Sequence, residues 1–242
     1  MNKNKELTAL VLASNETFSL EEVIEKLISF SFLNKIIIVS PKFVSSNCLE
    51  TQKNLSKKYS NIKCLIQPEQ FPGYGGAVKY GLSYVDTPYF CWLDGDGETD
   101  PSYLEDMYKI LIENKTLNIV NASRFKNNNK IIEGYGFISS ILTYCFQLLC
   151  KIFFTNKITD YTVGYRLYRT EFFKKFHYSS NDQNFSLETL LLPLLSNETK
   201  VSEVYYKWIK RSDGKSRNNI LNKFTYFKVF FKILYIKIFK KN

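Results

Sequence analysis

Three carboxylates alternate with glycines in the segment Asp94-Gly95-Asp96-Gly97-Glu98. The segment directly follows the apolar run from Tyr89 to Leu93, which has the length of a buried strand. Alternating residues of an extended chain point to one side, and glycines let the backbone approach a ligand closely. Carboxylate oxygens suit Mg²⁺ or Mn²⁺, which commonly bind between one or two carboxylates and a phosphate. The pattern predicts a metal–diphosphate site, with a solvated acidic turn as the alternative.

A glycine-rich turn, Gly73-Tyr-Gly-Gly-Ala77, opens a predicted helix that reaches about Tyr84. Backbone N–H groups at a helix N-terminus can hold a phosphate. The turn lacks the Gly-Lys-Ser/Thr of a Walker loop and does not follow the first strand as a dinucleotide fingerprint would. Two interpretations stay open: a phosphate-binding loop, or a plain turn whose glycines let the helix pack closely.

The elements that would position these residues alternate between strand and helix over about 120 residues. We expect strands at residues 7–13, 35–39, 62–66, 89–93 and 117–120, and helices after Ser19 and at 48–59, 73–84 and 101–113. This alternation favours an α/β fold with a mostly parallel central sheet and helices on both faces. The acids would then lie at the carboxyl edge of the sheet, where open α/β folds bind ligands.

The second half of the chain has a different character. Residues 134–150 carry no charge over 17 positions, which predicts a buried or membrane-touching helix and is short for a span of about 20 residues. A turn at 160–166, a helix at 185–195 that holds Glu188, and a strand at 200–208 follow.

The C-terminal segment 220–239 has apolar residues at helical spacing, interrupted by lysines. Its apolar surface is wider than one stripe, which favours a helix lying in a membrane interface over one packed on the domain. The lysines disfavour a full span, because their side chains would reach anionic headgroups.

The composition and net charge restrict the kinds of partner and cellular compartment that we expect. The chain has 242 residues, 45% hydrophobic, and a net charge of +10, which suits an anionic partner. The lysines are dispersed and no nucleic-acid motif is present, so we expect no nucleic-acid partner. Five scattered cysteines indicate free thiols in a reducing compartment, and no signal-peptide segment is evident at the N-terminus. The single histidine, His177, is expected to be a surface or packing residue.

Taken together, these pieces resemble family 2 glycosyltransferases with the GT-A fold, in the dolichyl-phosphate mannosyltransferase and polyprenyl-phosphate glycosyltransferase branch. The resemblance covers nearly the whole chain in order. It is carried by the glycine-rich turn, the Asp-x-Asp strand end, Ser123-Arg124, the segment Asp160-Tyr-Thr-Val-Gly-Tyr-Arg166, Glu203-Val204 and the loop Gly214-Lys-Ser-Arg217.

The resemblance implies a transferase domain over residues 1–216 and a membrane-interface helix over 217–242. The donor half would be 1–121 and the acceptor half 122–216. The protein would work in the cytoplasm, peripherally on a membrane, moving a sugar with inversion from a nucleotide-sugar to a polyprenyl phosphate.

The resemblance also implies a set of site residues. The metal ligands, for Mg²⁺ or Mn²⁺, would be Asp94, Asp96 and Glu98. The residues expected to bind the nucleotide-sugar are Ala13, Asn15, Glu16, Gln67, Gly75, Gly76, Asp94 and Gly95. Those expected to bind the acceptor phosphate are Arg124, Lys130, Arg166, Lys215 and Arg217. The catalytic residues would be Asp94, Asp96, Arg124 and Asp160.

Two motifs depart from the family pattern. The first strand ends in Ala13-Ser-Asn-Glu16 and the second in Ser40-Pro-Lys-Phe43, where the family usually has Pro-x-Tyr-Asn-Glu and Asp-Asp-Gly-Ser. We therefore expect unusual base recognition and assign neither UDP nor GDP.

Three alternatives follow. A family 2 transferase with a hydroxyl acceptor would need a general base, for which Asp160 and Glu188 are the candidates. A degenerate, inactive homologue would have lost donor binding. A non-enzymatic protein would use its positive charge to bind anionic surfaces.

Overall fold

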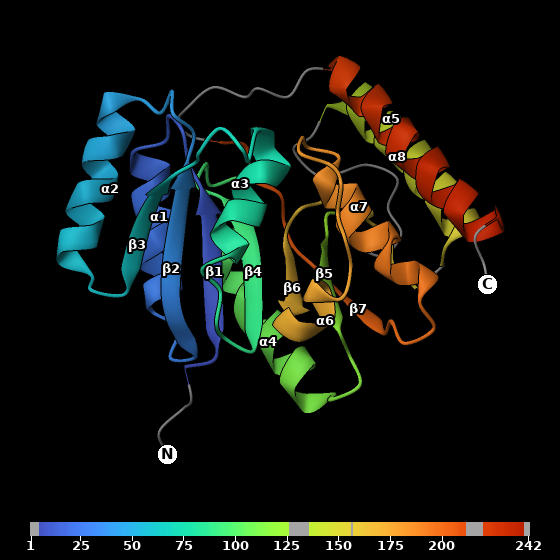
Figure 1. The fold of residues 1–242 in the computed structure, drawn as a ribbon, viewed down its shortest axis with the longest axis horizontal. Coiled ribbons are helices and arrows are strands. Elements are labelled where there is room, and N and C mark those ends of the chain that lie inside the picture. The colour runs from blue at the N-terminus through green and yellow to red at the C-terminus, as the bar shows by residue number, and fades with distance from the viewer. Residues whose placement is uncertain (1–4, 126–135, 156, 212–219, 240–242) are drawn as a thin grey trace.

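The computed structural model describes residues 5–125, 136–155, 157–211 and 220–239, with side chains from Thr225 onward in the last range. In this part of the chain seven strands form one sheet in the order β3-β2-β1-β4-β6-β5-β7 (Figure 1). The strands are β1 (Leu7–Leu12), β2 (Leu33–Ser40), β3 (Ile62–Ile66), β4 (Tyr89–Asp94), β5 (Ile119–Ser123), β6 (Arg166–Arg169) and β7 (Val201–Tyr205).

The strand directions bring the predicted chemistry to one edge. β1 pairs in parallel with β2 and β4, with Leu12 opposite Val39 and Asp94, so these strands end together. β6 is antiparallel to both of its neighbours, β4 and β5. β5 therefore runs in the same direction as β4, and its carboxyl end, Ser123, lies at the same edge as Asp94.

Helices cover both faces of the sheet (Figure 1). One face carries α1 (Phe18–Ile28), α2 (Ser46–Lys58) and α4 (Leu104–Glu113), which follows a short 3₁₀ turn at Pro101–Tyr103. The other carries α3 (Gly73–Leu82), α5 (Phe137–Phe153), α6 (Thr170–Lys174), α7 (Phe185–Leu191) and α8 (Ile220–Phe239).

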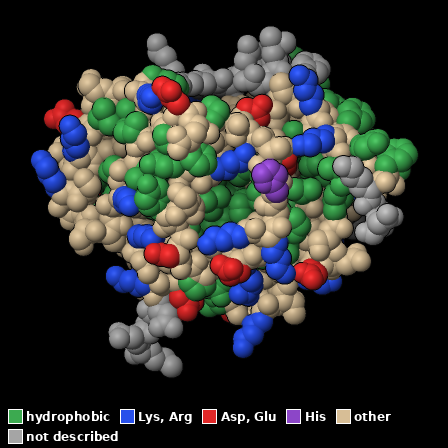
Figure 2. All heavy atoms as spheres, viewed as in Figure 1, with side chains coloured by type: hydrophobic (Ala, Val, Ile, Leu, Met, Phe, Trp, Pro, Cys, Tyr) green, Lys and Arg blue, Asp and Glu red, His purple; other side chains and the backbone are tan. Residues whose placement is uncertain are grey.

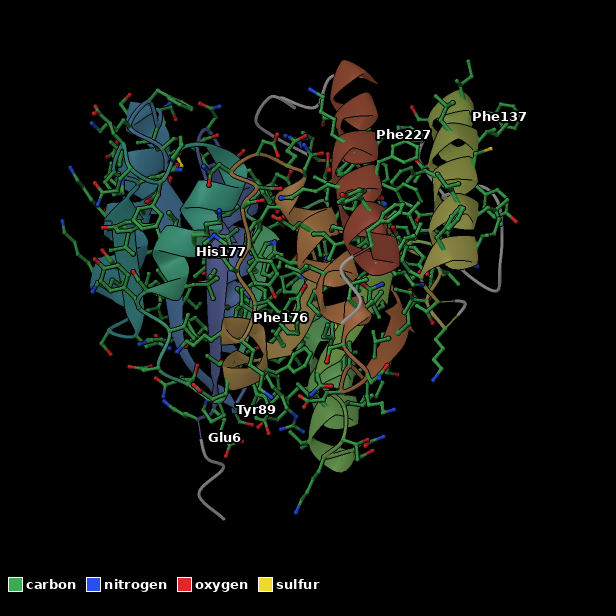
Figure 3. All side chains as sticks on the ribbon, turned by 45° about the vertical axis from the view of Figure 1, so that its right-hand side comes forward. Glu6, Tyr89, Phe137, Phe176, His177 and Phe227 are labelled. Atoms are coloured by element: carbon green, nitrogen blue, oxygen red, sulfur yellow. The ribbon has the colours of Figure 1, made fainter. Side chains whose placement is uncertain are left out.

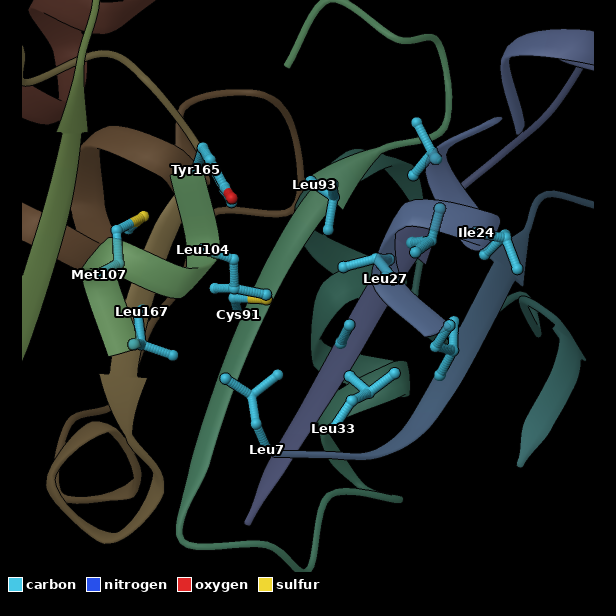
Figure 4. Packing of buried hydrophobic residues seen from close by; sticks show 14 of the residues in the cluster. Leu7, Ile24, Leu27, Leu33, Cys91, Leu93, Leu104, Met107, Tyr165 and Leu167 are labelled. Atoms are coloured by element: carbon cyan, nitrogen blue, oxygen red, sulfur yellow. The ribbon is translucent and has the colours of Figure 1, made fainter. Parts of the chain in front are cut away.

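Each face has its own apolar core. On the first face, Ile24 and Leu27 of α1 and Met107 of α4 pack against sheet residues such as Leu7 and Cys91 (Figure 4). On the second face, stacked and edge-on rings dominate: Trp92 stacks on Tyr168 at 5.3 Å between ring centroids. Strands that are apolar on both sides are expected for a mostly parallel sheet covered by helices.

The expected α/β alternation is confirmed, and the differences are local. The helix expected at 185–195 ends at Leu191, because Pro193 cannot continue it and a 3₁₀ turn follows at Pro193–Leu195. The sequence patterns did not predict β6 and α6. β6 has only four residues, and it lies in the centre of the sheet because β4 and β5 both hold it.

The two helices with the strongest apolar character both exist. The uncharged segment forms α5, and the C-terminal segment forms α8, whose Phe230 and Ile233 are buried in the second core. Over the described residues, no helix is both long enough and apolar enough to cross a membrane. The proposed boundary at 216/217 lies outside the described residues.

Candidate active site

The acidic segment is a tightly packed turn at the end of β4. The Gly95 N–H donates to the Leu12 carbonyl at 2.8 Å, and the Ser19 hydroxyl donates to the Gly95 carbonyl at 3.0 Å. A Cβ at Gly95 would lie 2.9 Å from Leu20, and Gly97 has φ of +74°, so both positions favour glycine. The turn is therefore anchored to β1 and α1, and is not a loose solvated loop.

Arg211 binds two of the three predicted metal ligands. Its Nη2 lies 2.8 Å from Asp96 Oδ2, and its Nε lies 2.8 Å from Glu98 Oε1. The other oxygen of Asp96 accepts the Glu98 N–H at 3.0 Å. The backbone after β7 is held there as well, since the Ile209 N–H donates to the Glu98 carbonyl. Among the described residues, no three metal-binding side chains are arranged as a cluster.

The acids crowd one another despite this arginine. Burial and the neighbouring carboxylates of Asp96 and Glu98 raise the pKa of Asp94 well above its ordinary value. Burial and Glu98 raise the pKa of Asp96 to about 6. Glu16 adds further negative charge. The site would therefore be stabilised by additional positive charge.

Across the site, Arg124 follows β5 and forms a two-pronged ion pair with Asp160. Arg124 Nε lies 2.6 Å from Asp160 Oδ2, and Nη2 lies 2.8 Å from Oδ1. Burial alone would raise the pKa of Asp160, but Arg124 outweighs it and holds the pKa below its ordinary value. Asp160 is fully buried, so it remains an ionised counter-ion that fixes the direction of Arg124.

The loop that carries Asp160 is itself held from two sides. Glu203 of β7 accepts the N–H groups of Thr159 and Asp160. Gln147 of α5 accepts the Tyr161 N–H at 2.7 Å, and donates to Thr162 Oγ1 at 3.2 Å and to Asp160 at 3.4 Å. The pairing makes Asp160 a positioning residue in this structure, which does not support the general-base role considered for a hydroxyl acceptor.

A cavity of about 130 Å³ opens between the acidic turn and Arg124. Asp94, Glu98, Arg124 and Thr162 are among the residues that line it. The remaining polar and aromatic lining residues include Tyr74, Gln183, Ser186, Tyr206, Trp208 and Tyr226. Carboxylates, an arginine, hydroxyls and ring faces are the kinds of groups that bind sugars and phosphates.

Tyr74 enters this cavity because residue 164 is a glycine. A Cβ at Gly164 would lie 3.0 Å from the Tyr74 hydroxyl, 3.1 Å from Trp92 Nε1 and 3.2 Å from Ser186 Oγ. Burial and the nearby charge of Asp94 raise the pKa of Tyr74 well above its ordinary value, so the hydroxyl keeps its proton. It is available as a hydrogen-bond donor beside Asp94.

The residues expected on the nucleotide side lie near the same edge but turn inward. Ala13 is buried, and its N–H donates to the Val39 carbonyl. The Glu16 carboxylate accepts the N–H groups of Ser14 and Asn15, which shapes the turn after β1. Gln67 donates to the carbonyls of Phe71 and Gly73. Through these contacts Glu16 and Gln67 stabilise the loops at this edge of the sheet. That the edge also binds the nucleotide stays a prediction.

The glycine-rich turn packs closely against another segment. A Cβ at Gly75 would lie 2.7 Å from Phe185 and 2.8 Å from the Ser180 carbonyl, and one at Gly76 would lie 2.4 Å from Phe71. The Gly76 N–H donates to the Asn181 carbonyl. The N-terminus of α3 is therefore covered, so this structure favours close packing over the phosphate-binding loop for Gly75 and Gly76.

The expectation that Arg166 binds the acceptor phosphate is not supported, because Arg166 lies in the middle of the sheet. It pairs with Trp92 and Asn121 on the neighbouring strands and is fully buried. Its guanidinium donates to Asn121 Oδ1 and to the carbonyls of Tyr161 and Ser186. The other basic residues expected there, Lys130, Lys215 and Arg217, lie outside the described residues.

Glu188, a candidate general base for a hydroxyl acceptor, is also engaged elsewhere. It is buried and accepts the N–H groups of Ser179 and Ser180 and the Ser179 hydroxyl. The single histidine, His177, is exposed, as expected for a surface residue (Figure 2). Neither side chain lines the cavity.

Several residues of the site were not predicted, among them Tyr74, Gln147, Thr162 and Arg211. Arg211 belongs to the same basic segment as Lys215 and Arg217, and Tyr74 lies within the glycine-rich turn, so both were near a recognised pattern. Gln147 gave one signal, a polar residue in the middle of an uncharged apolar run.

The sequence is similar to known glycosyltransferases. The model of the family described as glycosyl transferase family 2 matches residues 8–176. A dolichyl-phosphate beta-glucosyltransferase of Trichomonas vaginalis is 28% identical over 166 residues, which cover 67% of this chain and 50% of that protein. One of Dictyostelium discoideum is 26% identical over 224 residues, covering 86% of this chain and 68% of that protein. The chain thus spans about half the length of the first of these relatives.

Among solved structures, the glucosyl-3-phosphoglycerate synthase of Mycobacterium tuberculosis has a similar fold. In complex with Mn²⁺, UDP and phosphoglyceric acid it matches with a TM-score of 0.73 at 11% identity, covering 95% of this chain and 78% of that one. The likeness confirms the expected GT-A type of α/β fold. Since the family model extends from β1 through α6, over more than half of the sequence, this chain belongs to glycosyl transferase family 2.

Proposed function

We propose that this chain is an inverting glycosyltransferase that moves a sugar from a nucleotide-sugar to a polyprenyl phosphate at a membrane surface. One observation carries the proposal. The cavity is lined by the acids that end β4 and by the arginine that follows β5, so that a donor diphosphate and an acceptor phosphate can meet across a sugar. The names of the two relatives, both dolichyl-phosphate beta-glucosyltransferases, support a lipid phosphate as acceptor.

The donor diphosphate would bind at the acidic turn with Mg²⁺ or Mn²⁺. The donor set fits such an ion, because it consists of hard carboxylate oxygens with more negative charge than Arg211 neutralises. Burial, and then the neighbouring carboxylates, raise the pKa of Asp94, so a cation bound there would stabilise the ionised acids. Asp96 would be the main ligand, with Asp94 and Glu98 beside it. When bound, the ion would neutralise the charge that develops on the leaving diphosphate. Arg211 would exchange its contact with Asp96 for one with the diphosphate.

Arg124 would bind and orient the acceptor phosphate, since Asp160 fixes its direction. An oxygen of this phosphate attacks the anomeric carbon, a new carbon–oxygen bond forms, and the nucleoside diphosphate leaves from the opposite side. The phosphate is already an anion, so positioning and charge neutralisation suffice and no general base is needed. This agrees with the engagement of Asp160 and Glu188 in other contacts, and it disfavours the hydroxyl-acceptor alternative.

The protein would act peripherally on the cytoplasmic side of a membrane, with α8 at the interface. The five cysteines are all free, in keeping with a reducing compartment. UDP-glucose is the first donor to test, because the two relatives are named glucosyltransferases and the structural neighbour binds UDP.

The donor site is tested by thermal unfolding with UDP-glucose and Mn²⁺, separately and together. We expect the melting temperature of the wild-type chain to rise most when both are present. Arg211→Gln should melt at a lower temperature in the absence of metal and gain more from Mn²⁺, because Asp96 and Glu98 lose their cation. Lys210→Gln, a change at the exposed neighbouring residue, should behave like wild type.

The absence of any shift with UDP-, GDP- or other nucleotide-sugars would contradict the donor site. It would favour the inactive homologue. Equal metal responses of Arg211→Gln and Lys210→Gln would show that Arg211 does not balance the acidic cluster.

A further inference from the structure

Helix α5 has polar residues on its buried face and large apolar residues on its exposed face, the reverse of a surface helix on a water-soluble protein. Its buried residues include three polar ones, Ser140, Thr143 and Gln147. Its outward residues are large and apolar, with Ile138 70% exposed and Ile152 76% exposed. Phe137, Ile141, Leu142 and Leu148 are exposed as well. In a helix that only packs on its own domain, these two faces would be exchanged.

The inward polar face explains why the helix is held in this orientation. Gln147 bonds the backbone of Tyr161 and the side chains of Thr162 and Asp160, next to the cavity. Thr143 bonds the Ser139 carbonyl within the helix. Turning the helix over would leave a buried loop without these partners, at a cost for each unsatisfied group. The apolar face is therefore kept outward by contacts that organise the site.

Helix α8 lies beside α5 and extends the same surface (Figure 3). Phe146 of α5 packs against Phe227 and Phe230 of α8, with ring centroids 5.1 and 5.9 Å apart. On the outer side of α8, Phe231, Tyr235 and Ile238 are 56% to 58% exposed. Phe137 points away from the body of the molecule, and hydrophobic side chains gather along this edge in Figure 2. We call the outward faces of the two helices the α5–α8 surface.

The charged residues of the two helices are all lysines, and one of them, Lys232, pairs with Glu188 of α7, with 3.6 Å between Nζ and Oε1. Neither α5 nor α8 contains an acidic residue, whereas α5 has Lys151 and α8 has Lys223, Lys228, Lys232 and Lys237. Lys228 and Lys232 are exposed along one side of α8. A second copy of the chain would bring lysines against lysines. A monolayer with anionic headgroups instead offers an apolar interior to the rings and negative charge to the lysines.

We propose that the α5–α8 surface is a docking surface for a lipid monolayer, and that α5, held by Gln147, contributes to it together with the C-terminal helix. Exposed apolar patches of this extent mark interaction sites. The two helices lie side by side and would enter the headgroup region together, without spanning it.

The inference rests on the proposed function in one respect: a polyprenyl phosphate would reach the cavity from this surface. Tyr226 of α8 lines the cavity, and Gln147 of α5 bonds the loop that orients Arg124. Docking on lipid would thus bring the acceptor side of the cavity to the headgroup level, where the phosphate of a lipid acceptor is found.

Co-sedimentation of the full chain with vesicles tests the inference without requiring transfer activity. The probes are vesicles of phosphatidylcholine alone and of phosphatidylcholine with phosphatidylglycerol, at low and high salt. The wild-type chain should bind the anionic vesicles, with part of the binding surviving high salt because apolar side chains are inserted. Ile138→Glu together with Ile152→Glu should weaken binding by about a hundredfold, since two exposed isoleucines no longer enter the monolayer.

Phe43→Glu is the matched control. Phe43 is 65% exposed, but it lies in the turn after β2, on a different part of the molecule. This variant should bind vesicles like wild type, and all variants should show the melting temperature and monomeric mass of a folded chain.

Equal loss of binding in Phe43→Glu and in the α5 variant would overturn the inference, as would failure of the wild-type chain to bind any vesicle. A wild-type dimer that dissociates in the α5 variant would show that a second copy covers the surface instead. Transfer to a detergent-solubilised acceptor by a chain that ignores vesicles would refute the docking surface and leave the proposed function intact. Vesicle binding without any transfer would support the docking surface and contradict the proposed function.

Discussion

At the scale of single residues, some charged side chains line the cavity and others support the residues that do. Asp160 and Arg166 illustrate the second group. Both belong to one motif, yet Asp160 orients Arg124 and Arg166 fastens the centre of the sheet. Arg124, Asp94 and Glu98 are charged residues that line the cavity.

The supporting part of Asp160 gives a pH-dependent prediction. Its pKa in the folded chain is below the ordinary carboxyl value of about 3.9. A lowered folded-state pKa contributes stability that is complete above the unfolded pKa and is lost as the pH falls through the folded pKa. Asp160→Asn should therefore destabilise the chain at neutral pH by about 3 kcal/mol, because Arg124 loses its buried partner. The variant should then lose less stability than wild type on acidification.

Urea unfolding of both chains between about pH 2 and pH 7 measures this difference. Asp86→Asn is the matched control, since Asp86 is largely exposed and pairs with Lys35 at the surface. Its effect should stay within about 1 kcal/mol. A parallel pH dependence of Asp160→Asn and wild type would contradict the ionised, paired state of Asp160.

At the scale of elements, local patterns predicted the β1–β4 half well and the β5–β7 half less well. Apolar runs bounded by turn residues fixed the position of β3 and placed β4 within one residue of its observed end. β6 could not be predicted from the sequence, because its four residues, two of them arginines, do not show the alternation of apolar and polar residues typical of a strand. Its position between β4 and β5 depends on contacts across the chain. The burial of Arg166 follows from that position and could not be inferred from the motif.

Long-range contacts also account for the residues of the site that were not foreseen. Arg211 reaches Glu98 across 113 positions in the sequence, and Tyr74 reaches the cavity because Gly164 lacks a side chain. Charge and composition pointed to a basic segment near the C-terminus, but could not say which of its residues meets the acids. The site residues at the end of β4, by contrast, are consecutive in the sequence, so the strand, the glycines and the acids could be recognised together.

The packing of α3 can be tested at this scale. Gly75→Ala should lower the free energy of unfolding by about 1–3 kcal/mol, because the new methyl group would lie against Phe185 and the Ser180 carbonyl. Gly136→Ala is the control, since no atom lies within 4 Å of the position of its Cβ. Chemical denaturation compares the two. A Gly75→Ala chain of wild-type stability that binds nucleotide-sugar less well would restore the phosphate-binding interpretation of this turn.

At the scale of the whole molecule, charge and apolar surface are distributed unequally. The net charge of +10 includes the lysines of α5 and α8, two helices without acidic residues, whereas Asp94, Asp96 and Glu98 follow one another at the carboxyl end of β4. Tyr226 of α8 and Asp94 of β4 both line the cavity. This distribution of charge supports the proposed transfer from an anionic donor to an anionic lipid at a surface.

The central claim, sugar transfer to a polyprenyl phosphate, is tested most directly by following labelled glucose from UDP-glucose into an organic-soluble product. The assay contains Mn²⁺ and a detergent-solubilised polyprenyl phosphate. The wild-type chain should form a labelled lipid, and Asp96→Ala, with an unchanged circular dichroism spectrum, should form it at least about a hundredfold more slowly. The same panel includes GDP-linked and other UDP-linked sugars, so that a different donor would be found. No labelled lipid from any donor, or equal rates for wild type and Asp96→Ala, would contradict the account.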